Sequence, residues 1–278
     1  MFRADLLSHK RILITGGGSG LGAAMAERFA ELGASLVLCG RREDVLNNTA
    51  DALRAKTGVM VETISCDLRQ ADAVDEMFNR IWEKGPLYAL VNNAAATFIA
   101  QTETLSARAA DAILATTLHG AMYCTLAAGK RWIEAEHGGV VLSILSTSVR
   151  TGRAFTAPSA IAKSGLEAMT RSLAVEWGPK GIRLVAIAPG PFPTAGATRQ
   201  LMPEQRQQQS PAAARNPLGR VGDPLELANL AAYLICAEAG YINGETVATD
   251  GGAHLRTSGA EDLLQWSDAE WAAHRAKR

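Results

Sequence analysis

The sequence has no net charge, no paired cysteines and no long apolar run. Its 28 basic and 28 acidic residues are interspersed, and without a basic stripe a nucleic-acid partner is not expected. The four cysteines are scattered and form no CxxC pair, so buried thiols in a reducing compartment are expected rather than a zinc or redox site. No apolar run reaches the ~20 residues that cross a bilayer, and residues 1–10 contain no apolar segment of the signal-peptide type. We therefore expect a cytoplasmic protein with no metal site and no membrane partner.

Apolar segments typical of buried strands alternate with helical patterns along the whole chain. Strands are predicted at residues 11–15, 35–39, 59–65, 87–92, 139–145, 182–188 and 246–249. Helices are predicted at residues 21–32, 43–57, 71–83, 107–136, 160–177 and 225–237. Fully apolar strands that alternate with helices indicate a parallel sheet covered on both faces. We predict an α/β fold of the Rossmann type, doubly wound, in which a single domain over residues 1–278 forms a seven-stranded parallel sheet with helices on both faces.

Two segments lie outside this alternation. Residues 194–216 are rich in Gln, Pro and Ala and follow the sixth predicted strand, at the edge of the sheet where ligands bind. We interpret them as a lid over the substrate, with a surface insertion as the alternative. Residues 253–278 form a C-terminal tail.

A glycine-rich turn links the first predicted strand to the first predicted helix. Glycines permit a tight turn and let the backbone approach a pyrophosphate, while the helix N-terminus offers free N–H groups and the positive end of its dipole. A flexible turn without a ligand is the alternative, but the position within a βαβ unit favours a dinucleotide site. The residues predicted to bind the cofactor there are Thr15, Gly16, Gly18, Ser19, Gly20, Leu21 and Gly22.

The end of the second predicted strand bears on which dinucleotide binds. It reads Cys39-Gly40-Arg41-Arg42, without the acidic residue that binds the ribose 2′-hydroxyl of NAD(H). Two guanidinium groups suit the doubly charged 2′-phosphate of NADP(H). The alternative is a pair of solvated arginines at a helix start, where the dipole mildly disfavours cations. We predict NADPH (NADP) as the cofactor, with Arg41 and Arg42 at its 2′-phosphate.

Motifs beyond the glycine-rich turn give the chain a family resemblance. With Asn92-Asn93-Ala94-Ala95 after the fourth predicted strand and Pro189-Gly190 after the sixth, the chain resembles the short-chain dehydrogenase/reductase family from residue 10 to about residue 252. The resemblance implies that Lys163 holds the nicotinamide ribose and that Asp67 covers the adenine edge. It implies further cofactor contacts at Leu68, Asn93, Ala94, Ala95, Pro189, Gly190, Phe192 and Thr194.

Position 159 departs from the family pattern. Ser159 stands four residues before Lys163, where the family has its catalytic tyrosine, whereas Ser146 matches the family's catalytic serine. The stretch Pro158 to Lys163 resembles the Ser-x-x-x-Lys helix of the 2,4-dienoyl-CoA reductases. Further matches to that group are Phe98-Ile99, Glu176-Trp177-Gly178, Gly219-Arg220 and a tail that contains Ser258-Gly259. This narrower resemblance implies NADPH-dependent reduction of 2,4-dienoyl-CoA, an acyl-CoA substrate, in the β-oxidation of unsaturated fatty acids.

The resemblance leaves the proton donor open. The mitochondrial-type reductases have an asparagine where this chain has His119 and a tyrosine where it has Ser148. A conjugated thioester accepts hydride far from its carbonyl, so negative charge spreads to the thioester oxygen and donors at that oxygen matter most. For His119 a packing role is the alternative, and for Ser148 a plain loop hydroxyl. The catalytic candidates are Lys163, Ser159, Ser146, His119 and Ser148, with Thr117, which replaces the family's helix asparagine, as a further donor.

Two other functions remain open on the sequence alone. One is a carbonyl or alcohol oxidoreductase in which Ser159 or Ser146 replaces the tyrosine, although a serine hydroxyl is a much weaker acid than a phenol. The other is a cofactor-binding protein with weakened catalysis that acts as a sensor or assembly partner. Whichever applies, small apolar residues on more than one face of the predicted helices 107–136 and 160–177 favour burial against other subunits, and a homotetramer is expected.

Overall fold

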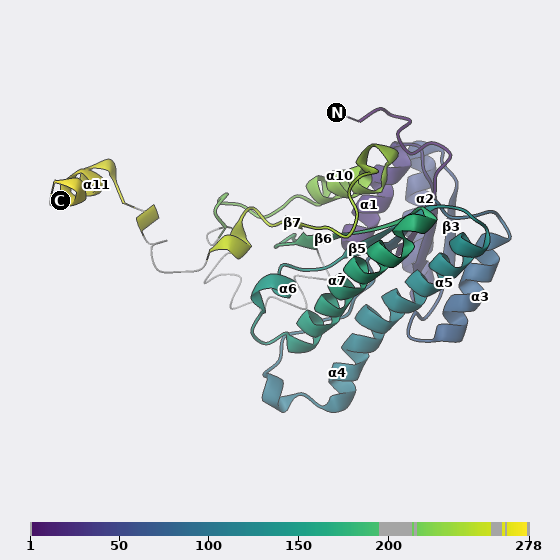
Figure 1. Ribbon diagram of the computed structural model, residues 1–278, viewed down its shortest axis with the longest axis horizontal. Helices are drawn as coiled ribbons and strands as arrows, with labels where there is room; N and C mark the ends of the chain where they lie inside the picture. The colour runs from purple at the N-terminus through teal and green to yellow at the C-terminus, as the bar shows by residue number, and fades with distance from the viewer. Residues whose placement is uncertain (1, 195–212, 214–215, 257–262, 265, 277–278) are drawn as a thin grey trace.

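A parallel sheet lies at the centre of the fold in the computed structural model, which describes residues 2–194, 213, 216–256, 263–264 and 266–276 (Figure 1). The sheet has seven strands in the order β3-β2-β1-β4-β5-β6-β7, which confirms the predicted fold class. β4 begins at Ala89 rather than at residue 87, because the carbonyl of Leu87 accepts a hydrogen bond from the Trp132 indole. The strands are β1 (Arg11–Thr15), β2 (Ser35–Gly40), β3 (Val61–Ser65), β4 (Ala89–Asn92), β5 (Gly139–Ile144), β6 (Ile182–Pro189) and β7 (Thr246–Thr249).

Helices cover both faces of the sheet, as a doubly wound fold requires. One face carries α1 (Gly20–Glu31), α2 (Glu43–Thr57) and α10 (Pro224–Ile235). The other carries α3 (Ala71–Trp82), α5 (Gly120–Glu134) and α7 (Ala157–Trp177). The shorter elements include α4 (Ala107–Leu114), α6 (Ser148–Thr151), α11 (Asp268–Arg275) and the 3-10 turns η1 (Thr102–Thr104), η3 (Gly178–Lys180), η5 (Ala237–Ala239) and η6 (Ala253–Leu255). α7 begins three residues before its predicted start, since Pro158 in the first turn needs no N–H partner.

Side chains of the central strand β1 alternate between the two apolar layers. Ile12 and Ile14 enter the cluster beneath α1 and α10, whereas Leu13 enters the cluster beneath α3 and α5. All three are fully buried. A strand that is buried on both faces carries mostly apolar side chains, which is why the inner strands appear as nearly continuous apolar runs in the sequence.

The helix predicted at residues 107–136 is divided by a wider turn. α4 is followed by a π-helical segment, η2 (Ala115–His119), and then by α5. Within η2, Thr117 Oγ1 accepts a hydrogen bond from the Ala96 N–H at 3.0 Å and donates one to the Ala96 carbonyl at 3.2 Å. Single π-helical turns are rare and frequently lie at functional sites. This turn fixes the loop after β4 against the helical layer.

Residues Ala107–Glu134 are, among the described residues, the one stretch that is long and apolar enough to cross a membrane, and 50% of its most apolar window is buried in this fold. Its α5 part packs against α3 and α7 as a layer helix. At Gly129 the two helices α5 and α7 approach so closely that an added Cβ would lie 2.4 Å from the Trp177 ring. Small residues on α5 therefore bring α7 close to it and set where α7 presents its side chains.

The predicted lid and tail are described only in part. Of the lid at residues 194–216, only Thr194, Ala213 and Asn216 belong to the described residues. Of the tail at residues 253–278, the structure describes η6, a few residues after it and α11, which Figure 1 places beyond the end of the sheet. The lid and the single-domain organisation remain predictions.

Candidate active site

The carboxyl ends of β1 and β4 mark the point where the strand order reverses. β1 pairs with β2 on one side and with β4 on the other, so the chain leaves β1 and β4 in opposite directions. In open parallel sheets such a point leaves a crevice in which ligands bind. The candidate site is built from the loops that follow β1 to β4 and, further along the same edge, from those that follow β5, β6 and β7.

The turn after β1 has a backbone shape that favours glycine. Gly16 has φ +66° and Gly20 φ +56°, in the left-handed region. At Gly22 an added Cβ would lie 2.3 Å from the Gly16 carbonyl oxygen, so α1 approaches the turn too closely for a side chain. Ser19 is the N-cap of α1, and its hydroxyl makes no capping bond, which leaves N–H groups of the first turn to an external acceptor. This arrangement suits an anionic group such as a pyrophosphate.

Thr15 ties the loops after β1 and β4 together. Its Oγ1 accepts hydrogen bonds from the N–H groups of Asn93 at 3.0 Å and Ala94 at 3.1 Å, and it donates to the Val91 carbonyl at 3.2 Å. In return Asn93 Nδ2 donates to the carbonyls of Thr15 at 2.9 Å and Gly16 at 3.3 Å. The Asn93 carboxamide therefore supports the turn, whereas Ala94 and Ala95 line the cavity described next.

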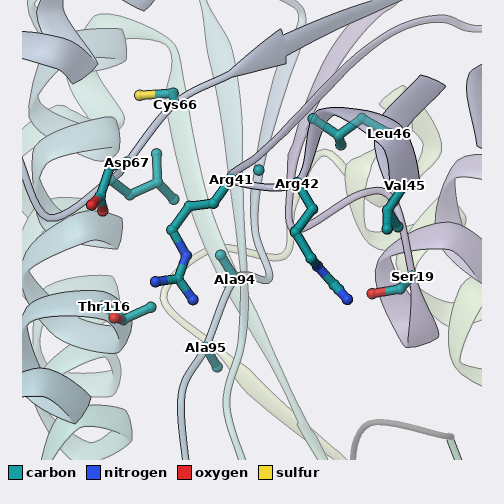
Figure 2. Close-up of a pocket in the computed structure, with 14 residues that line it drawn as sticks. Ser19, Arg41, Arg42, Val45, Leu46, Cys66, Asp67, Ala94, Ala95 and Thr116 are labelled. Carbon is teal, nitrogen blue, oxygen red and sulfur yellow. The ribbon is translucent and has the colours of Figure 1, made fainter.

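A cavity of about 220 Å³ opens beside the glycine-rich turn. Figure 2 shows two arginine side chains that reach into it from the loop after β2, Arg41 toward Asp67 and Thr116 and Arg42 toward Ser19. The cavity is lined by Gly16, Gly18, Ser19, Gly40, Arg41, Arg42, Val45, Leu46, Cys66, Asp67, Leu68, Ala94, Ala95 and Thr116. The structure thus brings Gly16 and Gly18, the two arginines and Asp67 to one cavity, next to the N-terminus of α1, whereas Gly20 and Gly22 do not line it.

Asp67 is the acidic residue of this cavity wall, and Arg69 orients it. Arg69 Nε lies 2.9 and 3.0 Å from the two carboxylate oxygens, and the Arg69 N–H donates to the same carboxylate at 3.1 Å. These bonds from Arg69, together with the charge of Arg41, lower the pKa of Asp67. Its carboxylate is therefore ionised and held in place at the position where the family resemblance puts the adenine edge.

Lys163, on α7, is a buried amine with 6% of its surface exposed. Its Nζ donates to the carbonyl of Ile144, the last residue of β5. Burial lowers the pKa of Lys163 to about 8, because surroundings of low polarity disfavour the charged form. An amine at this position can donate hydrogen bonds to sugar hydroxyls and can exchange a proton near neutral pH.

Ser146, Ser148 and Ser159 follow β5, at the same edge of the sheet. Ser146 Oγ accepts a hydrogen bond from the N–H of Ser148, the first residue of α6, at 3.2 Å. Ser159 lies one helical turn before Lys163 and on the same face of α7. All three serines are half-buried. The structure therefore joins Ser146 to Ser148 by a hydrogen bond and places Ser159 one turn before Lys163 on α7.

His119 is not placed with these groups. Its side chain is exposed, and its ring contact is with Tyr123, with 6.2 Å between the centroids. The inward positions of the same turn belong to Thr117, which bonds to Ala96, and to Leu118, which lies against Gly165 of α7. The structure therefore places His119 at the surface beside Tyr123, and its role as a donor remains a prediction. Because η2 is π-helical, the inward-facing hydroxyl at this point is that of Thr117.

The loop after β6 reaches both the glycine-rich turn and a second cavity. Thr194 lies 3.6 Å from the position of a Cβ added at Gly20, so this loop meets the turn as the resemblance implies. Phe192 packs on Gly222, where an added Cβ would lie 2.3 Å from its ring. The second cavity measures about 110 Å³ and is lined by Pro191, Phe192, Asn216, Leu218, Arg220, Val221, Gly222, Glu226, Thr249, Asp250 and Gly251.

Five residues that line the first cavity were not among the sequence candidates: Gly40, Val45, Leu46, Cys66 and Thr116. For Val45 and Leu46 a signal existed, since they are apolar residues in the first turn of a helix that begins at the site. Cys66 follows β3 directly and could have been chosen because its neighbours Asp67 and Leu68 were. For Thr116 the sequence contains no such signal, since the π-helical turn decides that its side chain faces the cavity.

The cysteines are buried, as expected. Interaction between the thiols of Cys39 and Cys66 raises the pKa of Cys39 and lowers that of Cys66. Among the described residues no group of three or more His, Cys, Asp and Glu side chains is arranged to hold a metal ion.

Known proteins of one family match nearly the whole chain. The family profile described as Enoyl-(Acyl carrier protein) reductase matches residues 16–254. The chain belongs to the short-chain dehydrogenase/reductase family. A solved structure of a short-chain dehydrogenase from Bacillus anthracis gives a TM-score of 0.80 at 38% identity, over 90% of this chain and 98% of that one. The structure of an actinorhodin polyketide ketoreductase with NADPH gives a TM-score of 0.83 at 28% identity, over 91% and 99%.

Relatives with names that state a reaction include dienoyl-CoA reductases. A probable 2,4-dienoyl-CoA reductase of Caenorhabditis elegans, named as producing (3E)-enoyl-CoA, is 38% identical over 98% of this chain and 90% of its own length. One of Bacillus subtilis, named as producing (2E)-enoyl-CoA, is 39% identical over 90% and 98%. An uncharacterised oxidoreductase of C. elegans is 40% identical over 95% and 87%.

The buried amine of Lys163 should make stability depend on alkaline pH. Its pKa is about 8 in the folded protein and 10.5 when unperturbed, so between these values the unfolded chain binds the additional proton. The free energy of unfolding of the wild type, relative to Lys163→Met, should rise by up to about 1.4 kcal/mol per pH unit from about pH 8 to about pH 10.5. Urea unfolding of both proteins across this range measures the difference. A difference that does not change with pH would contradict the assignment.

Proposed function

We propose that this chain is an NADPH-dependent 2,4-dienoyl-CoA reductase that serves β-oxidation of unsaturated fatty acids. The observation that carries the proposal is that a serine, Ser159, lies one helical turn before the buried Lys163 on α7. A hydroxyl as weakly acidic as that of serine is a poor proton donor to the oxygen of a ketone. It is adequate where hydride adds to a carbon far from the carbonyl along a conjugated chain, because the carbonyl oxygen then needs only hydrogen bonds. The names of the two dienoyl-CoA reductases at 38% and 39% identity support the same chemistry.

The residues of the first cavity fit a phosphorylated dinucleotide. Gly22 lies where a side chain would collide with the turn, the first turn of α1 offers its N–H groups, and Arg41 and Arg42 supply two positive charges. When bound, NADPH would supply a hydride to the substrate. Lys163 would hold the ribose hydroxyls, and Arg41 and Arg42 would hold the 2′-phosphate.

The chain's own groups then act on the thioester. Hydride addition at C5 of a 2,4-dienoyl thioester moves electron density along the conjugated chain to the carbonyl oxygen. Hydroxyl donors at that oxygen stabilise the resulting dienolate, and Ser146, Ser148 and Ser159 are the half-buried hydroxyls at this edge of the sheet. A proton delivered to C2 gives the (3E)-enoyl product, whereas a proton delivered to C4 gives the (2E)-enoyl product. The position of the proton donor therefore decides the isomer.

We expect loss of the arginines to weaken NADPH binding and to leave NADH binding unchanged. Arg41→Ala and Arg42→Ala each remove a charged donor to the 2′-phosphate, which is worth about 1.5–3 kcal/mol, so each should raise the Kd for NADPH about 10- to 100-fold. Calorimetric titration of both cofactors measures this. Arg80→Ala removes an exposed arginine of α3 and serves as the control. Equal losses of NADPH and NADH affinity would contradict the assignment.

The activity itself is tested with a 2,4-dienoyl-CoA and NADPH, by the loss of the diene absorbance and by chromatography of the product isomers. The wild type should turn over, and Ser146→Ala should lower kcat by about 10²- to 10³-fold with the Kd for NADPH unchanged. Ser164→Ala, at an exposed position of α7, is the matched control. Tight NADPH binding without turnover at high enzyme concentration would instead favour a cofactor-binding protein.

We further propose that the protein is a homotetramer of the cytoplasm. Apolar side chains of α5 and α7 remain exposed in the single chain, with Leu126 at 48%, Ile161 at 59% and Val175 at 80%. Burial of such side chains against a second copy would stabilise an assembly. Light scattering of the purified protein measures its mass, and a monomer at micromolar concentration would contradict the proposal.

A further inference from the structure

A chain of polar contacts joins the tail after β7 to the serines after β5. Its centre is His254 in η6, whose Nδ1 lies 2.8 Å from Oδ2 of Asp250. On its other side, His254 Nε2 lies 3.5 Å from Nη1 of Arg150, which belongs to α6. His254 thus stands between a carboxylate and a guanidinium that come from different loops.

Asp250 is the fixed end of this chain of contacts. Its side chain is 3% exposed, and its oxygens accept the N–H groups of Gly252 at 3.0 Å and His254 at 2.7 Å. Gly190 of the loop after β6 packs on it, since an added Cβ there would lie 2.5 Å from Asp250 Cβ. A carboxylate can only accept, so Nδ1 of His254 carries the proton and Nε2 of the neutral ring has a lone pair to offer Arg150.

Arg150 is the exposed end of this chain of contacts. Its Nη2 donates to the carbonyl of Thr246 in the edge strand β7 at 2.8 Å, while Nη1 faces His254. One guanidinium therefore holds α6 to the edge strand and to η6 together. α6 has only four residues, so it has little hydrogen bonding of its own to keep it in place.

α6 in turn orients Ser146. The N–H of Ser148 donates to Ser146 Oγ at 3.2 Å, and the N–H of Val149 donates to the Ser146 carbonyl at 3.1 Å. A shift of α6 would therefore change the direction of the Ser146 hydroxyl. Displacements of about 1 Å in groups that orient a site can cost about 100-fold in rate.

We propose that His254 is a positioning residue for Ser146, and that it acts through Arg150 and α6. Nε2 is the atom that matters, because it is the acceptor that Arg150 meets. The bond from Nδ1 to Asp250 sets the tautomer and the ring orientation that present this acceptor. The effect on catalysis rests on the proposed function, whereas the effect on α6 does not.

Three substitutions at one position separate the two ring nitrogens. His254→Gln can place an acceptor oxygen near the Nε2 position, His254→Asn can place a donor near the Nδ1 position, and His254→Ala does neither. We expect Ala and Asn to lower kcat about 10- to 100-fold, with the Kd for NADPH unchanged, and Gln to restore most of kcat. His137→Ala, an exposed histidine after α5, is the control.

Hydrogen exchange of the α6 amides gives a second readout that needs no substrate. The N–H groups of Arg150, Thr151 and Gly152 bond within α6, to Thr147, Thr147 and Ser148, and should exchange faster in the Ala and Asn variants than in the wild type and the Gln variant. If the wild type does not reduce a dienoyl-CoA, the proposed function fails while this measurement still tests the contact. The inference is overturned if Asn restores the wild-type behaviour and Gln does not, if all three variants behave alike, or if exchange in α6 is unchanged.

Discussion

The pairing of β1 with β4 is the contact on which the site depends. Thr15, at the carboxyl end of β1, holds the two strands together there. One threonine hydroxyl, 1% exposed, bonds to both N–H groups at the start of the loop after β4. The Asn93 carboxamide donates hydrogen bonds to the carbonyls of Thr15 and Gly16, at the start of the glycine-rich turn. In a dry interior an unmade bond of this kind costs about 1–3 kcal/mol, so the two loops separate only at a high cost. The crevice between them is thereby fixed before any ligand arrives.

Lys163 imposes a second constraint. Its buried amine bonds to the Ile144 carbonyl rather than to a carboxylate. Such an amine makes the fold less stable than an apolar residue would. Groups that lower stability in this way cluster at functional sites. The same helix carries Ser159 one turn earlier, and it lies close to α5 because Gly129 leaves room for the Trp177 ring. The packing of Trp177 at the C-terminal end of α7 therefore helps to set the position of Ser159 near its N-terminal end, because both belong to one rigid helix.

The sequence was sufficient for the sheet and for the position of the glycine-rich turn. Strands that are apolar on both faces, as in Ile12, Leu13 and Ile14, give a pattern with few other solutions, and the turn comes directly after β1, so its position follows from that of β1. The catalytic residues stay predictions, and the structure adds to them mainly at the π-helical turn. His119 was chosen because it stands where related reductases have an asparagine, and the structure leaves it exposed while Thr117 points inward and bonds to Ala96. The hydropathy pattern of a regular helix contains no mark of such a turn. The contacts of Arg150 with β7 and η6 join residues that are about a hundred positions apart, and no local pattern predicts them.

The ion pair between Asp67 and Arg69 has a consequence for the encounter with a polyanion. Among the described residues, Asp67 is the one carboxylate on the wall of the first cavity, and it forms an ion pair with Arg69. Arg69 thereby offsets much of the charge of Asp67, and Arg41 and Arg42 leave the cavity wall net positive in a chain whose total charge is zero. Attraction of a phosphorylated molecule is then local, with a range of about 8 Å at physiological ionic strength. The association rate should depend on salt through these two side chains, while the dissociation rate depends on the bonds that they make together with the backbone cradle beneath them.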